Sequence, residues 1–378
     1  MEGKGREIRE RTAIPSSRRP GSALPRIGEI QRRLLEAGAG SFVVTHPPNV
    51  FYLCGFTGSA AALLIGRRAA TLFTDGRYTI QAREEVREAR VHIVRRSLLT
   101  EASEEIHRMG RGHVAFEPAH LTIAQMRQLQ SRVRRGTRWI AWEGVLEKLR
   151  SVKTAEEIAR IRAAAQLAGD VFEEVLRLVK PGVTEMELAA EIEYRMRRKG
   201  ASGPSFSTIV ASGARSALPH ARATSKPLKK NELVVFDLGA ILRGYCSDMT
   251  RTVFIGRAST KVRRWYRAVL EAQQAARDAI SPGVKASQVD AAARDVFARY
   301  GLGRHFTHST GHGLGLEVHE LPRLARGEKA VLEPGNVVTV EPGVYFEGIG
   351  GIRVEDDVAI VAGGTEVLTR AKRNFLEL

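Results

Sequence analysis

The chain is organised around two segments of its second half, VVFDLGAILRGYCSDMTRT at Val234–Thr252 and VVTVEPGVYFEGIGGIRVEDDV at Val337–Val358. Each segment begins with a short apolar run of the kind that forms a buried strand, and each run ends on a carboxylate. A second carboxylate follows 11 residues later in the first segment and 14 residues later in the second. The four acidic residues are Asp237 and Asp248, then Glu341 and Glu355.

A wider internal repeat accompanies these segments. Residues 181–189, PGVTEMELA, are echoed by residues 282–291, PGVKASQVDA, about one hundred positions further along. The first carboxylates of the two segments are 104 residues apart and the second carboxylates 107 residues apart, a drift that loop insertions explain. We therefore predict two related halves that face each other, with the four carboxylates meeting near a pseudo-two-fold axis.

Four carboxylates that converge in a folded interior require positive charge, because burying an uncompensated carboxylate is costly. His312, in the run GHGLG at residues 311–315, adds an imidazole to the set. Four oxygen ligands and one imidazole suit hard divalent cations better than thiolate-rich zinc sites do. The sequence thus predicts two divalent metal ions, Mn2+ first and Co2+ or Zn2+ as alternatives, held by Asp237, Asp248, His312, Glu341 and Glu355.

The composition is that of a globular protein. At 378 residues, with 43% hydrophobic and 27% charged residues, the chain is long enough for two domains with a large core. The longest apolar stretch, at Ala60–Gly66, is far shorter than the ~20 residues needed to span a bilayer, and the amino terminus lacks the apolar segment of a signal peptide. We therefore expect a cytoplasmic protein with no membrane partner. Cys54 and Cys246 have no metal-ligand spacing and are expected to be reduced.

The net charge of +17 invites a nucleic-acid function, but the arrangement of the charges argues against a specific one. Arginines are interspersed with glutamates, as in REEVREAR at Arg83–Arg90, which is typical of a solvated, salt-bridged helix face. Aromatic residues make up 6% of the chain, so little surface is available for base stacking. Residues 1–25 form a basic tail rich in Gly, Pro, Ser and Arg that we predict to be disordered.

The order of helix and strand patterns predicts two domains after this tail. Residues 26–148 alternate amphipathic helices with apolar strands and predict a smaller α/β domain. Residues 149–378 begin with a long helix capped by Thr154 and Glu157 and then change to strands and tight turns, which predicts an α+β domain. Two more helices of this domain are predicted at Lys261–Ile280 and Ser287–Tyr300.

Two motif-like runs do not support other chemistries. GHGLG at residues 311–315 lacks the GxGxxG spacing of a dinucleotide-binding loop. HELPR at residues 319–323 lacks the second histidine of HExxH, which excludes the mononuclear zinc peptidases of that class.

These residues resemble the pita-bread metallopeptidases, the family of methionine aminopeptidase, prolidase and aminopeptidase P. The resemblance covers Leu149–Leu378 through the runs LRSVKTAEEI, SALPHA, VVFDLGA, GYCSDMTRT, HSTGHGLGLEVHE, VVTVEPGVY and GGIRVEDDV. Residues 26–148, with NVFYLCGFTGS and TDGRY, resemble the creatinase-type amino-terminal domain of the proline-directed members. The resemblance implies an α+β pita-bread catalytic domain with an internal pseudo-two-fold, preceded by a smaller α/β creatinase-like domain.

The resemblance also implies roles for single residues. Asp237 would hold one metal ion with both oxygens, and Asp248 and Glu355 would bridge the two ions. His312 and Glu341 would complete the second metal site, where Glu341 also counts as a catalytic residue. Other residues would grip the substrate, stabilise the tetrahedral oxyanion or shuttle protons, namely His220, His308, His319, Tyr345 and Arg353.

The implied activity is metal-dependent hydrolysis of the Xaa-Pro bond, which releases the first residue from peptides with proline at the second position. An Xaa-Pro bond is a tertiary amide without an N–H and with a fixed ring, so general aminopeptidases stall there. An Xaa-Pro aminopeptidase is the first interpretation and an Xaa-Pro dipeptidase, or prolidase, the alternative. An alternative of another class is a non-catalytic binding protein on the same fold, whose signature would be lost ligands. The family makes a homodimer the default.

Overall fold

The computed structural model describes residues 26–110 and 112–378. The predicted disordered tail at residues 1–25 lies outside the described residues. Within the described part of the chain, no helix is both long enough and apolar enough to cross a membrane.

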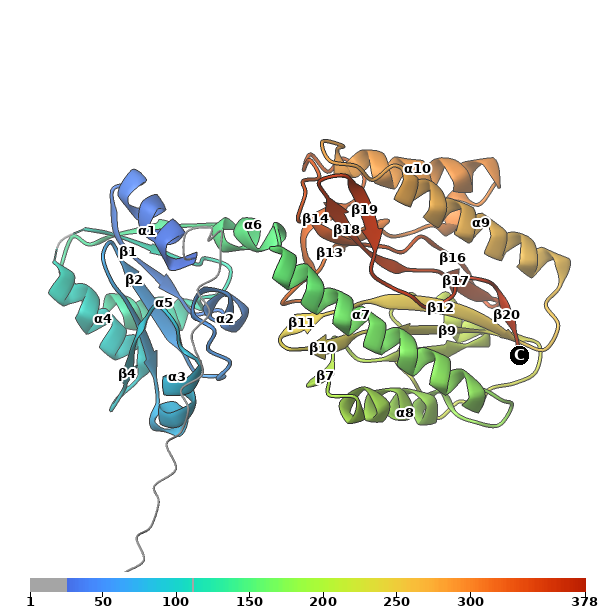
Figure 1. Ribbon diagram of the computed structural model, residues 1–378, viewed down its shortest axis with the longest axis horizontal. Helices are drawn as coiled ribbons and strands as arrows, with labels where there is room; N and C mark the ends of the chain where they lie inside the picture. Colours follow the sequence, from blue (N-terminus) through green and yellow to red (C-terminus); the bar gives the residue numbers. More distant parts are fainter. Residues whose placement is uncertain (1–25, 111) are drawn as a thin grey trace, which may run out of the picture. The chain divides into compact units, whose positions relative to one another are not determined.

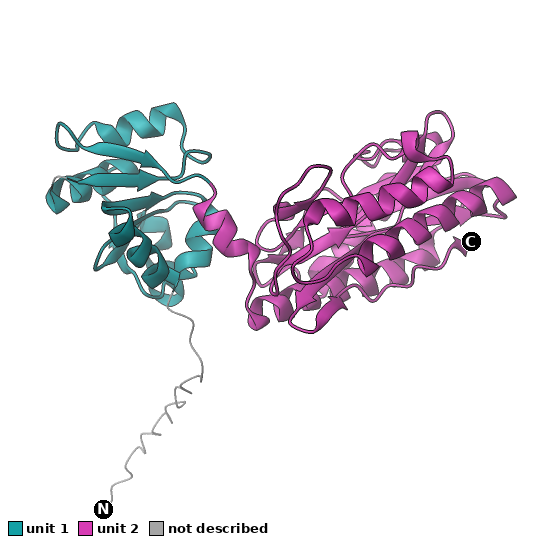
Figure 2. Cartoon of the chain, turned by 90° about the horizontal axis from the view of Figure 1, so that it is seen from above, with its two compact units in different colours: residues 1–143 teal, residues 144–378 magenta. Residues whose placement is uncertain are grey.

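The chain divides into two compact units, residues 1–143 and residues 144–378, which Figure 2 shows in different colours. The boundary predicted between residues 148 and 149 falls inside helix α6, Val145–Ser151, which belongs to the second unit. The charged residues at the end of this helix become important below.

The first unit is built on one mixed sheet of six strands, β1 Ala39–Val44, β2 Ala62–Gly66, β3 Ala70–Thr74, β4 Arg90–Ile93, β5 His113–Phe116 and β6 Arg138–Ala141. The strand order is β4-β3-β2-β1-β5-β6. Its helices are α1 Arg26–Glu36, α2 Pro47–Cys54, α3 Thr79–Glu85, α4 Leu98–Met109 and α5 Ile123–Gln130. The buried apolar strands β1 and β2 lie at the centre of the sheet, and the unit is the predicted α/β domain.

The second unit carries two larger sheets and two smaller ones. The helices besides α6 are α7 Ala155–Val175, α8 Glu185–Arg198, α9 Thr260–Asp278 and α10 Ala286–Arg299. A four-stranded sheet has the order β20-β12-β9-β8, with β8 Ile209–Ser212, β9 Glu232–Leu238, β12 Met249–Ile255 and β20 Leu376–Glu377. A five-stranded sheet has the order β14-β13-β15-β18-β19, with β13 Gly311–Gly313, β14 Glu320–Leu324, β15 Val337–Val340, β18 Asp356–Val361 and β19 Gly364–Val367. The smaller sheets are formed by β7 Gly203–Pro204, β10 Ala240–Leu242 and β11 Tyr245–Cys246, and by β16 Gly343–Phe346 and β17 Gly350–Arg353.

The helices of this unit begin where the sequence predicts them. The Thr154 side chain accepts a hydrogen bond from the amide of Glu157, and the Glu157 side chain accepts one from the amide of Thr154, so the predicted capping box at the start of α7 is confirmed. The helices predicted at 261–280 and 287–300 are α9 and α10, each displaced by one or two residues at its ends. Differences of this size are usual at frayed helix termini.

The two halves of the second unit repeat one order of elements, a pair of helices followed by a pair of antiparallel strands. In the first half these are α7, α8, β9 and β12, and in the second half α9, α10, β15 and β18. Figure 1 shows α8 and α10 on opposite sides of the strands. The internal repeat expected of a pita-bread fold is therefore present.

The repeated PGV tripeptides make equivalent contacts. The Gly182 amide donates to the carbonyl of Leu228 at 2.9 Å, and the Gly283 amide donates to the carbonyl of Leu332 at 2.8 Å. Each leucine amide donates back to the valine after its glycine, at 2.8 Å in both halves. Both glycines have φ near +90°, at +94° and +89°, which a residue with a side chain adopts only with strain.

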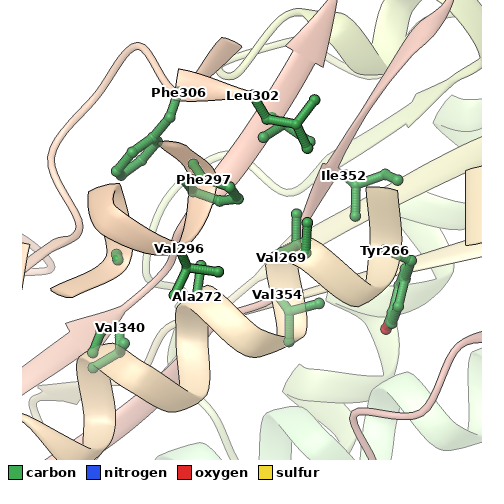
Figure 3. Close-up of a cluster of buried hydrophobic side chains, with 14 of the residues drawn as sticks. Tyr266, Val269, Ala272, Val296, Phe297, Leu302, Phe306, Val340, Ile352 and Val354 are labelled. Carbon is green, nitrogen blue, oxygen red and sulfur yellow. The ribbon is translucent and has the colours of Figure 1, made fainter. Parts of the chain in front are cut away.

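A continuous apolar core fixes the strands of the second half. It packs α9 and α10 against β15 and β17 through residues that include Val269, Phe297, Val340 and Ile352, all fully buried (Figure 3). The first half has its own core between α7, α8 and β9, in which Phe172 meets Phe236. Full burial of such side chains stabilises the fold by roughly 1.5–3 kcal/mol each. The ends of the core strands are thereby held in place.

Candidate metal centre and cleft

Each half places its two carboxylates at equivalent points of its strand pair. Asp237 lies near the end of β9, and Asp248 directly precedes β12. Glu341 directly follows β15, and Glu355 directly precedes β18. Because the strands of each pair are antiparallel, the end of one lies beside the start of the other. The repeat therefore gathers two carboxylates per half at one place.

His312, on β13, connects the carboxylates of the two halves. Its Nε2 lies 3.8 Å from Oδ2 of Asp248 and 3.4 Å from Oε1 of Glu341. One ligand atom each from Asp248, His312 and Glu355 lie within 4.8 Å of one another. Residues separated by up to about 107 positions in the chain thus meet within the reach of a bound ion.

Crowding and burial raise the pKa of three of the carboxylates. Burial, reinforced by the negative charges of Glu355 and Asp237, raises the pKa of Asp248 well above its ordinary value. Burial raises the pKa of Glu341 to about 7, although the positive charge of Arg353 opposes the shift. Burial and the charges of Glu341 and Asp237 also raise the pKa of Glu355 well above its usual range. These three carboxylates can all be ionised at neutral pH only if positive charge is supplied to them.

The same carboxylates present oxygens that nothing in the described chain satisfies. These atoms are Oδ1 of Asp237, Oδ1 of Asp248 and Oε1 of Glu355, which are buried and receive no hydrogen bond from the described residues. Leaving a buried acceptor unsatisfied costs about 1–3 kcal/mol, and more for a charged group. Divalent cations would neutralise the charge and occupy these oxygens, so the residues present fit the predicted metal ions.

Two threonines that the sequence analysis did not single out orient the predicted ligands. Thr250, on β12, donates to Oε2 of Glu355 at 2.6 Å and accepts from Nε of Arg353 at 2.9 Å. Thr339, on β15, accepts the amide of His312 at 3.1 Å. Each threonine lies two residues from a predicted ligand, and alternate residues of a strand point to the same side. That spacing is the signal that could have identified them.

Arg353 links the carboxylates to two other predicted site residues. Its Nη2 lies 2.5 Å from Oδ2 of Asp237, and its Nη1 donates to the hydroxyl of Tyr345 at 2.8 Å. Nε2 of His308 lies 2.9 Å from the same hydroxyl. Burial raises the pKa of Tyr345 to about 12 and lowers the pKa of His308 to about 4, so both side chains are neutral at pH 7. Their contact is a hydrogen bond between neutral groups.

A cleft of about 470 Å3 opens beside the ligand set. His220 and His319 are both exposed in this cleft, and the ring of His319 lies edge-on to that of His312 with 4.4 Å between centroids. Tyr345 is buried and reaches the cleft through its contacts with His308 and Arg353. The structure thus brings together the predicted residues that line the cleft, His220, His308, His312, His319, Glu341 and Arg353.

One cleft residue has no counterpart in the sequence analysis. Arg323, on β14, lies opposite His312 in the antiparallel β13–β14 pair, and its exposed side chain lines the cleft. Among the described residues, it forms no ion pair and no hydrogen bond through its side chain. Residues directly opposite each other on paired strands share one face, so the guanidinium is a free cation beside the ligand set.

The family of the chain follows from comparison with known proteins. Residues 159–362 match the Metallopeptidase family M24, and residues 26–152 match the Creatinase/Prolidase N-terminal domain. The chain belongs to metallopeptidase family M24. Membership implies bound divalent metal ions and peptide substrates, and it confirms the resemblance stated from the sequence.

Three similar proteins narrow the substrate class. An Xaa-Pro dipeptidase from Pyrococcus furiosus is 44% identical over 234 residues, which cover 62% of this chain and 67% of the relative. The structure of an Xaa-Pro dipeptidase from Bacillus anthracis has a TM-score of 0.90 and 39% identity, over 93% of this chain and 99% of that one. The structure of an X-Pro aminopeptidase from Thermotoga maritima MSB8 has a TM-score of 0.86 and 35% identity, over 92% and 100%. This M24 protein is a proline-directed peptidase.

Proposed function

We propose that this peptidase is an Xaa-Pro dipeptidase that depends on two divalent metal ions. The sequence analysis placed the Xaa-Pro aminopeptidase first and the dipeptidase second. Two of the three similar proteins above are named Xaa-Pro dipeptidases, which favours reversing that order. A homodimer and a cytoplasmic location remain predictions.

The observation that carries the proposal is the unpaired Arg323 in the cleft. In an Xaa-Pro dipeptide the free carboxylate is attached directly to proline, whereas in a longer peptide an uncharged amide occupies that position. A guanidinium without a carboxylate partner in the described chain suits a substrate that brings its own carboxylate. Leu321, exposed on the same strand and in the same cleft, offers an apolar surface to the proline ring.

The proposed metal ligands are the four carboxylates and His312 of the central cluster. Mn2+ is the proposed ion, since the set consists of four oxygen donors and one imidazole. Bound divalent ions would supply a water nucleophile at neutral pH and polarise the scissile carbonyl. Arg353 would hold Asp237 in place, because it donates to that carboxylate from a buried position.

The residues exposed in the cleft would handle the substrate and its protons. His319 is in reach of a group placed beside His312, and an imidazole can donate or accept a proton near neutral pH. His220 lies on the same cleft and would contact the substrate. The neutral His308, held by Tyr345, would accept or donate a hydrogen bond without carrying charge.

The test compares Ala-Pro with its carboxamide Ala-Pro-NH2 in the presence of Mn2+, using the wild-type protein and Arg323→Met. Losing a charge-assisted contact should lower kcat/KM for Ala-Pro by about 10- to 100-fold while leaving the slow hydrolysis of the amide unchanged. Arg326→Met, which removes a nearby exposed arginine outside the cleft, is the matched control. An enzyme that prefers Ala-Pro-Ala to Ala-Pro, and is indifferent to Arg323, would be an aminopeptidase instead.

A further inference from the structure

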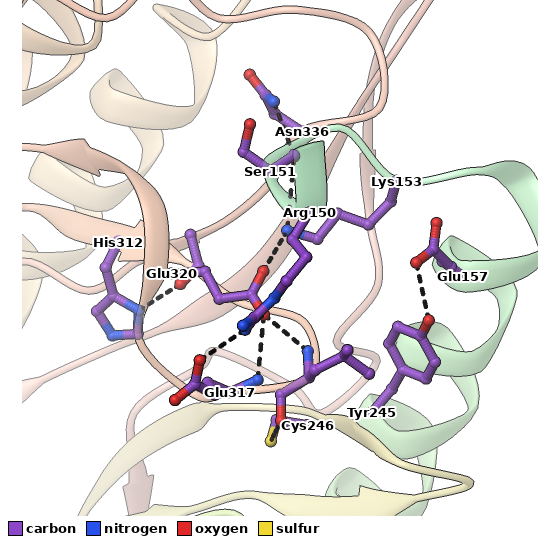
Figure 4. A network of polar contacts seen from close by, with 12 residues as sticks. Arg150, Ser151, Lys153, Glu157, Tyr245, Cys246, His312, Glu317, Glu320 and Asn336 are labelled. Atoms are coloured by element: carbon purple, nitrogen blue, oxygen red, sulfur yellow. Dashed lines mark hydrogen bonds and ion pairs between the residues drawn. The ribbon is translucent and has the colours of Figure 1, made fainter. Parts of the chain in front are cut away.

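A buried cluster of charged side chains lies beside the cleft and outside the ligand set. Arg150 lies in the last turn of helix α6, Lys153 lies two residues beyond the end of that helix, and Glu320 begins β14 (Figure 4). Their side chains are 2%, 1% and 4% exposed. Nζ of Lys153 lies 2.9 Å from Oε2 of Glu320, and Arg150 pairs with Oε1 of the same carboxylate. A buried carboxylate with two cations is tolerated because each charge has a partner.

Glu320 also accepts hydrogen bonds from the backbone of the loop that precedes it. Its Oε1 receives the amide of Leu316 at 2.9 Å and the amide of Glu317 at 3.1 Å. Arg150 donates to Oε2 of Glu317 at 2.7 Å, which adds a second tie to the same loop. The Glu320 carboxylate therefore binds the backbone of the β13–β14 loop and joins this loop to the end of α6.

Glycine at position 315 is needed for this packing. A Cβ there would lie 2.7 Å from Oε2 of Glu320 and 2.9 Å from Cε of Lys153. On the other side, the carbonyl of Gly315 accepts the amide of Cys246 at 2.7 Å. The loop is thus held between the charged cluster and strand β11, which leads directly to the ligand Asp248.

The side chain of His319, the last residue of this loop, lines the cleft. It is exposed, and its ring makes no hydrogen bond to any described residue. Its position over His312 is therefore set by its backbone, and the next residue along that backbone is the clamped Glu320. An exposed side chain can be aimed accurately only if the backbone beneath it is rigid.

We propose that the cluster of Arg150, Lys153 and Glu320 positions His319 over the metal centre. Glu320 is then a positioning residue, which acts on hydrolysis only through His319 and touches no substrate itself. This inference rests on the proposed function, because it assigns His319 a part in the chemical step. Helix α6, at the start of the second unit, then lines the cleft and supports the loop that carries His319.

The first test measures the loop directly and needs no turnover. Amide hydrogen exchange in the metal-loaded protein should speed up at Leu316 and Glu317 by about tenfold or more in Glu320→Gln, because the charge that holds these amides is removed. Lys153→Met, which keeps the pair between Arg150 and Glu320, should give a smaller increase at the same amides. Unchanged exchange in both variants would show that the cluster does not hold the loop and would overturn the proposal.

The second test is a double-mutant cycle of Glu320→Gln with His319→Ala, assayed on Ala-Pro with Mn2+. Glu320→Gln alone should lower kcat by about 10- to 100-fold with KM nearly unchanged, as expected for a misplaced catalytic group. In the His319→Ala background the same substitution should lower kcat by less than about twofold, because the residue it positions is gone. Equal losses in both backgrounds would mean that Glu320 does not act through His319. Lys153→Met takes the place of Glu320→Gln in the cycle if the latter does not fold.

The matched control is Glu101→Gln in the first unit. Like Glu320, Glu101 closes a loop by accepting two backbone amides, those of Arg95 and Arg96 at 2.8 and 2.9 Å. This variant should lower the melting temperature and leave kcat unchanged. If the wild-type protein cleaves Ala-Pro-Ala and not Ala-Pro, the proposed dipeptidase activity fails while the cycle, run on the tripeptide, still decides the role of Glu320.

Discussion

In the first half of the catalytic unit, β9 and β12 bring Asp237 and Asp248 to the predicted metal site. Apart from residues of α6, the residues of that half that line the cleft are Pro219 and His220. In the second half, β15 and β18 bring Glu341 and Glu355 in the same way, but β13, β14, β17 and the loops beside them add the remaining cleft residues, His308, Ser309, His312, Glu317, His319, Glu320, Leu321, Arg323 and Arg353. Both halves supply carboxylates of the predicted metal site. The second half supplies nearly all of the side chains that line the cleft.

This contrast shows how one scaffold can serve two purposes. The carboxylate pairs are tied to the ends of antiparallel strands, so they follow wherever the strand pair is repeated. Histidine and arginine side chains of the second half are instead carried by the loop and hairpin around β13 and β14, which the first half lacks in that form. Equivalent substitutions in the two halves should therefore have equal effects on metal binding and unequal effects on substrate turnover.

The largest expected effect is the loss of Asp248 or Glu355, the two carboxylates predicted to bridge the metal ions. Asp248→Asn and Glu355→Gln, which change equivalent positions, should each abolish hydrolysis and reduce bound metal. In the metal-free protein both should leave the melting temperature equal or higher, because burial and mutual repulsion already disfavour the ionised forms. The measurements are metal analysis, Ala-Pro hydrolysis and melting with and without Mn2+. Near wild-type activity with two bound metal ions in either variant would show that the two halves do not contribute equivalent ligands. Glu366→Gln, which removes a carboxylate from an exposed ion pair, is the control.

The next effect concerns the histidines that the two halves contribute to the cleft. His319→Ala should lower kcat by about 10²- to 10⁴-fold while KM and metal content change little, because a positioned acid-base group acts in the transition state. His220→Ala should cause a smaller loss of kcat, since His220 makes no hydrogen bond or ion pair to the ligand set among the described residues, whereas the ring of His319 packs against that of His312. Steady-state kinetics of both variants shows which substitution causes the larger loss of kcat. A raised KM at constant kcat for His319→Ala would assign that residue to substrate binding alone.

A smaller effect is expected from the threonines that orient ligands. Thr250→Val removes a 2.6 Å hydrogen bond to Glu355, whereas Thr339→Val removes a contact of 3.4 Å with Glu341. Loss of a group that orients a ligand commonly lowers metal affinity by about 10- to 100-fold, and the shorter contact should matter more. Titration of the metal-free variants with Mn2+ measures this difference. Equal affinities of the two variants for Mn2+ would show that the two hydrogen bonds contribute equally to metal binding.

The smallest effect lies in the helix starts of the repeat. Thr184 caps α8 by accepting the Glu187 amide at 3.1 Å, while Lys285, at the equivalent position before α10, makes no such side-chain bond. Thr184→Ala should lower the free energy of unfolding by about 1 kcal/mol, and Lys285→Thr should raise it by up to about that amount. Chemical denaturation of both variants at one metal concentration is the measurement. A stabilised Thr184→Ala variant would mean that the cap is not used in solution.

The convergence of the predicted ligands could be expected from the sequence because its signal is local and repeated. A carboxylate at the end of an apolar strand, found twice at similar spacing, predicts both a position in the sheet and a cationic partner. The helix caps at Thr154 and Thr184 were predictable for the same reason, since a capping box spans four residues.

Arg323 and Glu320 could not be recognised from the sequence in this way. The place of Arg323 depends on the pairing of β13 with β14, which sets it opposite His312. The role of Glu320 depends on Arg150, 170 residues earlier, and on Lys153, 167 residues earlier. Contacts between residues so far apart in the chain depend on the tertiary fold, and they produce no periodicity or spacing that can be recognised in the sequence.

Helix α6 has a consequence for how such a protein can exchange parts with its relatives. The two cations that hold Glu320 belong to the segment Arg150–Lys153, which a boundary drawn between residues 148 and 149 would separate from most of its own helix. Recombination that swaps the amino-terminal domain would keep the charged cluster together with the whole of its helix only if the crossover falls before Val145. The stretch from Val145 to Lys153 should therefore be inherited together with the peptidase half of the gene.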